Sequence, residues 1–124
     1  MANVGLRHGE SVNFMVRGDC MRILVNGESV AVRRQRFYLP GDVVVVRRRD
    51  HWNAHRFLGY ALGVHGVVAL TQADEAVRRD PAALVRAVVG RVECGVTVPD
   101  RATALGRYAR AVLHRLIEGG GWAL

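Results

Sequence analysis

Short valine-rich segments separated by turn residues fill the first three quarters of the chain, and they limit the folds that it can adopt. Each segment is apolar or partly alternating over six to ten residues, which favours a strand. The segments are residues 11–16, 29–35, 42–48, 54–62, 65–71 and 85–94. The stretches between several of them, such as "NGE" and "LPGD", are rich in turn-forming residues. Many short strands at this spacing predict a mainly-β fold, either a barrel or a sandwich.

The end of the chain has a different period, typical of an amphipathic helix. Apolar residues recur at helical spacing on one face. They are Leu105, Tyr108, Ala109, Val112, Leu113, Leu116 and Ile117. Asp100 or Thr103 is expected to cap the helix, and Gly119 to end it. We therefore predict a β domain over residues 1–98, followed within residues 99–124 by a helix that packs on it, on a partner protein or on a second copy.

Composition and length restrict the class of protein. The chain has 124 residues, half of them apolar, which is enough for one globular domain with its own core. Its apolar runs are far shorter than the roughly 20 residues of a spanning helix, and no secretory signal is visible at the amino terminus. We expect a soluble cytoplasmic protein. Two cysteines, Cys20 and Cys94, do not form a disulfide framework.

The charge of the chain is strongly basic, at +7, and it comes entirely from arginine, because the sequence contains no lysine. A lysine general base is therefore excluded, and arginine cannot replace it because its guanidinium stays protonated. The arginines are dispersed, without interleaved aromatic residues or a helix-turn-helix pattern. This favours a solvated basic surface over a specific nucleic-acid site.

The most informative short stretch is "RGDCMR", residues 17–22, between two predicted strands. Three interpretations of Cys20 compete: a nucleophile, a metal or disulfide ligand, and a small buried residue. The nucleophile requires an imidazole within hydrogen-bond reach to stabilise the thiolate. His55 is a polar residue within an apolar strand and is the candidate for that base. His51, four residues earlier, does not complete a convincing metal site, so we expect neither a metal nor another cofactor.

Several stretches in a fixed order resemble signal peptidase I and the LexA-type repressor peptidases. They are "VRGDCM" at 16–21, "GESV" at 27–30, "GDVVVV" at 41–46, "HRFL" at 55–58, "TQADEAVRRD" at 71–80 and "VVGRV" at 88–92. Together they cover roughly residues 12–93. Cys20 stands where this family has its nucleophilic serine. His55 stands where bacterial members have a lysine and where the archaeal and endoplasmic-reticulum members have a histidine.

The resemblance implies a peptidase mechanism. Cys20 would attack the peptide bond while His55 takes the thiol proton and returns it to the leaving amine. Asp74 or Asp80, at the family's spacing, would hold the far nitrogen of the imidazole ring. The peptide would be added as an extended strand beside the strand that precedes Cys20. The residues expected around it are Phe14, Gly18, Asp19, Met21, Val43 and Val45.

Two of these substrate-site residues carry specific expectations. Gly18 lacks the hydroxyl that signal peptidases often have at this position, so backbone N–H groups of the turn would hold the oxyanion. Asp19 would raise the pKa of the neighbouring thiol if it faced it, so its side chain is expected to point away.

The sequence leaves two functions open. The first is a peptidase that cleaves a leader or precursor peptide. The second is a catalytically inactive peptide-binding or regulatory module of the same fold, in which Cys20 is a relic.

Overall fold

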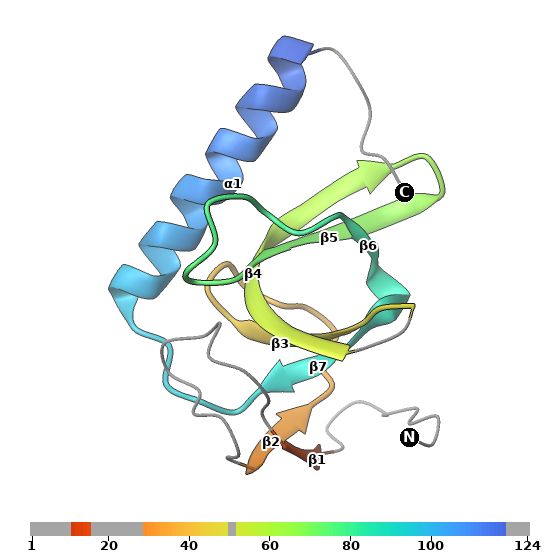
Figure 1. The fold of residues 1–124 in the computed structure, drawn as a ribbon, viewed down its shortest axis with the longest axis vertical. Coiled ribbons are helices and arrows are strands. Elements are labelled where there is room, and N and C mark those ends of the chain that lie inside the picture. The colour runs from red at the N-terminus through yellow and green to blue at the C-terminus, as the bar shows by residue number, and fades with distance from the viewer. Residues whose placement is uncertain (1–10, 16–28, 50–51, 119–124) are drawn as a thin grey trace.

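The structure is a computed structural model that describes residues 11–15, 29–49 and 52–118 (Figure 1). Within these residues, seven strands, a short 3-10 helix and one long α-helix follow one another. They are β1 (Ser11–Met15), β2 (Ser29–Arg33), β3 (Val43–Arg47), β4 (Trp52–Gly63), β5 (Gly66–Gln72), β6 (Ala83–Leu84), η1 (Val85–Ala87), β7 (Val88–Val92) and α1 (Val98–Glu118).

The described strands form one antiparallel sheet in the order β1-β2-β7-β3-β4-β5-β6. The predicted mainly-β class with a carboxyl-terminal helix is therefore confirmed. Within the described residues the sheet does not close into a barrel, because β1 and β6 lie at its two ends and do not pair with each other. The long strand β4 is strongly bent, and a register shift between Phe57 and Gly59 contributes to that bend (Figure 1).

The core lies on both faces of the sheet, as the alternation of side chains along each strand requires. One cluster combines buried residues of β3, β4, β5, β6 and β7 with Tyr38. Its members are Tyr38, Val44, Val46, Phe57, Ala69, Ala83 and Val88. The other cluster lies between the sheet and α1 and contains Leu58, Val68, Leu70, Ala82 and Ala104. Successive residues Phe57 and Leu58 thus belong to opposite faces of β4.

Helix α1 begins with a reciprocal capping pair. The Thr97 hydroxyl accepts from the backbone N–H of Asp100 at 3.2 Å, and the Asp100 carboxylate accepts from the N–H of Thr97 at 3.1 Å. The sequence predicts Asp100 or Thr103 as the cap. Asp100 takes part as the third helical residue, but the cap itself is Thr97. The predicted boundary at residue 99 is close to the observed start at Val98.

The helix packs against β4 through small and aromatic side chains (Figure 1). Tyr108 crosses Gly59, where an added Cβ would lie 2.5 Å from the Tyr108 ring, so glycine is required for this close approach. The Tyr108 hydroxyl donates to the carbonyl of Tyr60 at 2.5 Å. The predicted apolar face is rotated relative to the observed one. Five of its residues are exposed: Leu105, Ala109, Leu113, Leu116 and Ile117.

Candidate functional site

His55 projects from β4 on the face of the sheet opposite α1. It is paired across the strands with Val44, a member of the core cluster on that face. Its Nδ1 lies 2.6 Å from a carboxylate oxygen of Asp80, and only 14% of its side chain is exposed. Of the two aspartates left open by the sequence, Asp80 is therefore the one that contacts the ring. With Nδ1 engaged, Nε2 is the ring nitrogen that remains to exchange a proton.

Asp80 is itself held in place by Thr71. The Thr71 hydroxyl donates to the same carboxylate oxygen at 2.7 Å, and the Asp80 backbone N–H donates to the Thr71 carbonyl at 2.8 Å. Arg48 Nη2 lies 4.0 Å from the carboxylate. Burial alone would raise the pKa of Asp80, but the hydrogen bonds from His55 and Thr71 and the nearby positive charges hold it below its usual value. Asp80 thus stays ionised and fixes the orientation of the imidazole.

Asp74 has a different partner. Its two carboxylate oxygens accept from Arg56 Nε at 3.1 Å and Nη2 at 3.0 Å, a bidentate pair that is almost fully buried. Arg56 follows His55 in the strand and therefore projects to the opposite face, toward α1. Burial alone would lower the pKa of Arg56, but Asp74 and Asp100 raise it above its ordinary value. Asp74 consequently has a structural position and does not reach the histidine.

The Gly41-Asp42 pair has a structural role as well. Gly41 has a φ of +100°, a conformation that favours glycine, and its carbonyl accepts from Arg56 Nη1 at 2.8 Å. The buried Asp42 carboxylate accepts from the Leu39 N–H at 2.8 Å and from Arg101 Nη1 at 3.2 Å. These bonds fix the turn before β3 and join it to the first turn of α1.

Val43 and Val45 do not meet His55. Both side chains are buried, and alternation places them on the opposite face of β3 from Val44, the cross-strand neighbour of His55. Their role in shaping a pocket for a bound peptide stays a prediction. A run of four valines has no polar side to mark, so the sequence could not show which face of this strand lies on the same side of the sheet as His55.

Cys20, the proposed nucleophile, lies outside the described residues, as do its neighbours Gly18, Asp19 and Met21. Phe14 lies within β1, opposite Val30 of β2.

The sheet order separates β1, which precedes Cys20 in the sequence, from the strand that carries the histidine. Strands β2, β7 and β3 lie between β1 and β4. This corresponds to about 19 Å along a flat sheet, from four strand spacings of about 4.8 Å. Cys20 follows the last residue of β1, Met15, by five residues, which span at most about 17 Å when extended. Strands β1 and β4 are not neighbours in the sheet.

Sequence reasoning missed two residues near His55, namely Thr71 and Arg48. Thr71 is fully buried near the end of β5, directly after four apolar residues. A polar residue that follows an apolar strand segment and is buried needs a hydrogen-bond partner, and this pattern could have drawn attention to Thr71. Arg48 lies among three consecutive arginines, where sequence alone gives no reason to select one.

Comparison of the chain with models of protein families, with curated proteins and with solved structures found no match. In the part of the chain that the structure describes, no helix has the length and apolar character needed to cross a bilayer. The same residues contain no group of three or more histidine, cysteine, aspartate or glutamate side chains placed to hold a metal ion.

The lowered pKa of Asp80 predicts a pH-dependent contribution to stability. Since this pKa is lower in the folded than in the unfolded chain, the stabilisation is complete above the unfolded value of about 4 and is lost as pH falls through the folded value. Asp80→Asn should therefore lower the free energy of unfolding at pH 7 by about 1–3 kcal/mol, and by less at pH 3. Urea unfolding at the two pH values measures this. Glu75→Gln, which changes an exposed carboxylate, is the control, and an effect of Asp80→Asn that is equal at both pH values would contradict the prediction.

Proposed function

We propose that this protein is a peptidase of the signal peptidase and LexA type, with Cys20 as nucleophile, His55 as general base and Asp80 as the residue that orients the imidazole. The substrate would be an extended leader or precursor peptide made in the cytoplasm. The observation that carries the proposal is the hydrogen-bonded chain from His55 Nδ1 through Asp80 to Thr71.

The chemistry of this chain matches what a general base requires. A carboxylate on Nδ1 selects the tautomer that leaves Nε2 free to accept a proton, and it stabilises the imidazolium that results. A thiol near Nε2 would lose its proton to the ring and form a thiolate–imidazolium pair. After attack on the peptide carbonyl, the same nitrogen would return that proton to the leaving amine.

The position of β1 supports binding of an extended peptide. It ends the described sheet, and among the described strands it pairs only with β2. Its outer backbone groups have no strand partner among the described residues, and the proposal assigns them to a peptide bound by strand addition. Because β1 leads directly toward Cys20, a peptide bound there would run past the proposed nucleophile.

The sheet order favours one alternative, an inactive peptide-binding or regulatory module. The three strands between β1 and β4 allow a fold in which a peptide binds at the β1 edge while the histidine remains remote from Cys20. In this case the His55–Asp80 pair would only stabilise the fold.

The exposed face of α1 supports a contact with a partner protein or a second copy, which is a further part of the proposal. Leu105, Leu116 and Ile117 are between 53% and 75% exposed. Such side chains on one helix would be covered in a complex.

The pH dependence of cysteine alkylation distinguishes the peptidase from the inactive module. An imidazole beside Cys20 should move the inflection of its rate–pH profile with iodoacetamide below about pH 7, and His55→Ala should return it to about 8.5, the value of a free thiol. Peptide mapping by mass spectrometry reports each cysteine separately. Cys94 serves as an internal reference, since burial raises the pKa of its thiol despite the nearby arginines.

His65→Ala is the matched control, because His65 lies in the exposed turn between β4 and β5. It should leave the Cys20 profile unchanged. A wild-type inflection at or above about pH 8.5 would exclude the thiolate–imidazolium pair and favour the inactive module.

A further inference from the structure

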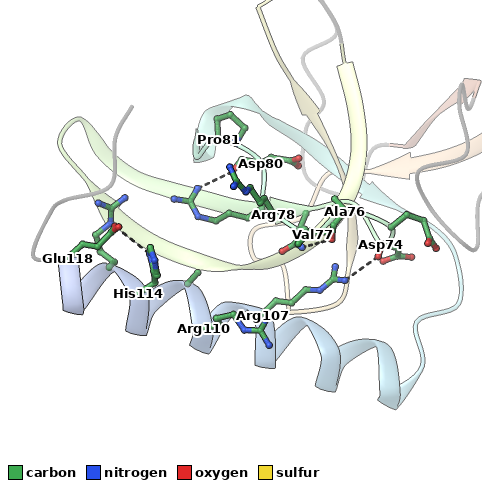
Figure 2. A pocket seen from close by; sticks show the side chains of 15 residues that line it. Asp74, Ala76, Val77, Arg78, Asp80, Pro81, Arg107, Arg110, His114 and Glu118 are labelled. Atoms are coloured by element: carbon green, nitrogen blue, oxygen red, sulfur yellow. Dashed lines mark hydrogen bonds and ion pairs between the residues drawn. The ribbon is translucent and has the colours of Figure 1, made fainter.

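A groove of about 960 Å³ runs between α1 and the segment 73–81, which connects β5 to β6 (Figure 2). Its volume lies at the upper end of the range of about 300–1,000 Å³ that is usual for ligand sites. Five arginines line it, from both walls. They are Arg78 and Arg79 on the connecting segment, and Arg107, Arg110 and Arg115 on the helix.

The carboxylates at the groove do not balance these arginines. Four carboxylates line it, and Asp74 is paired with Arg56, which does not line the groove. Three carboxylates, Glu75, Asp80 and Glu118, remain against the five arginines, and Glu118 also lies 3.4 Å from His114 Nδ1. The groove therefore carries an excess of positive charge beyond the general basicity of the chain.

Two of the arginines are available to a ligand from opposite walls. Arg78 and Arg110 are exposed, and within the described part of the chain neither makes a hydrogen bond or an ion pair (Figure 2). A guanidinium presents a planar set of donors that matches a carboxylate in a bidentate arrangement. An acidic side chain bound between the walls would thus gain charge-assisted hydrogen bonds from both.

A second pair of arginines increases the positive potential in the groove. Arg79 and Arg115 lie close enough to repel each other: burial, and then the charge of Arg115, lower the pKa of Arg79. Arg79 also donates to the backbone carbonyl of Asp80 at 2.9 Å, which holds it at this wall. A ligand carboxylate entering the groove would relieve this repulsion between like charges.

We propose that this groove binds acidic side chains of an extended peptide, and that the substrates are therefore peptides that carry glutamate or aspartate. That the bound peptide is a substrate rests on the proposed function. Asp80 provides the connection between the two sites, because it lines the groove and its carboxylate contacts His55.

The lining favours a peptide over a nucleic acid. Apolar residues lie among the arginines of the lining, including Val77, Pro81 and Ala111. No phenylalanine, tyrosine or tryptophan is among the residues that the structure places along this groove, whereas single-stranded nucleic acids are usually bound by stacking on such rings. Dispersed arginines with apolar residues between them suit an extended chain that carries acidic side chains at intervals.

Fluorescence anisotropy with a short fluorescein-labelled peptide tests the proposal. The probe alternates glutamate with alanine, and the reference probe has glutamine in place of every glutamate. Both are titrated with the full chain carrying Cys20→Ala, so that binding is measured without cleavage. We expect the glutamate probe to bind at least about tenfold more tightly than the glutamine probe, and the double variant Arg78→Glu/Arg110→Glu to remove that preference.

The matched control is Arg36→Glu/Arg86→Glu, which makes the same change of net charge at two exposed arginines outside the groove. It should change the affinity less than about twofold, allowing for its effect on long-range attraction. Equal weakening by both double variants, or equal binding of the two probes, would overturn the proposal. So would a labelled single-stranded oligonucleotide that binds more tightly than the glutamate probe and loses its affinity in the groove variant.

The two proposals fail in different ways. If the glutamate probe binds in the groove but the wild-type chain cleaves no peptide, the groove stands and the proposed peptidase function does not. If the chain cleaves peptides through Cys20 without regard to acidic residues, and the two probes bind equally, the peptidase function stands and the proposal for the groove does not.

Discussion

His55→Ala is expected to reduce peptide cleavage at least about a thousandfold. The variant removes the group that takes the proton from Cys20 and returns it to the leaving amine, and removal of a residue of such a unit costs several orders of magnitude in rate. Asp80→Asn should reduce the rate by a smaller factor, because the ring remains but its tautomer is no longer fixed by an ionised carboxylate.

Digestion of a peptide library, read by mass spectrometry, provides the measurement, since it detects cleavage at any sequence that the library contains. His65→Ala, at an exposed turn, should retain the wild-type rate, and Cys20→Ala should show no cleavage. Circular dichroism checks that His55→Ala remains folded. Cleavage by a folded His55→Ala or Cys20→Ala variant at the wild-type rate would rule out the proposed dyad.

Asp74→Ala is expected to lower the free energy of unfolding by about 3–5 kcal/mol, a large part of the 5–15 kcal/mol that is typical of a domain. The reason is that Arg56 is only 3% exposed and loses a bidentate partner, which leaves a buried charge uncompensated. The bond from Arg56 to the Gly41 carbonyl and the distant Asp100 carboxylate, at 3.9 Å, replace only part of that interaction. Chemical denaturation of the two proteins gives the difference.

A comparison with an exposed ion pair separates burial from charge pairing. Arg33 and Glu93 form a pair at 2.5 Å with side chains 44% and 35% exposed, and Glu93→Ala should cost less than about 1 kcal/mol. The double variant Arg56→Met/Asp74→Leu, which replaces both buried charges by apolar groups, should be more stable than Asp74→Ala alone. If Asp74→Ala costs no more than Glu93→Ala, the buried pair does not stabilise the fold as the geometry indicates.

The fold class could be predicted from sequence because it depends on local patterns. Valine-rich segments of strand length, divided by turns, specify a sheet whatever their partners are. The prediction of a strand over residues 85–94 was partly wrong, because the extent of this strand depends on its partners in the sheet. Its first residues form the 3-10 helix η1, and only Val88–Val92 lies between β2 and β3. The place of a strand in a sheet depends on pairings that its own sequence does not encode.

The helix shows the same division between local and tertiary information. Its length and approximate start follow from its period and from residues that cap it. The face that packs on the sheet does not follow from the sequence, because the helix has two apolar faces. The stripe with Ala104 and Tyr108 is the buried one, because small Ala104 and the missing side chain of Gly59 allow the helix to approach β4 closely. Leu105 and Leu116 are left exposed.

By itself, the sequence determined that the chain is a mainly-β domain with a basic surface and a helix at its end, and it selected His55 and two aspartates for attention. Only the tertiary structure decided between those aspartates. Asp74 and Asp80 lie six residues apart in one connection, yet the alternation of β4 directs His55 and Arg56 to opposite faces. Each aspartate meets the side chain on its own face, so one becomes a partner of the imidazole and the other half of a buried ion pair.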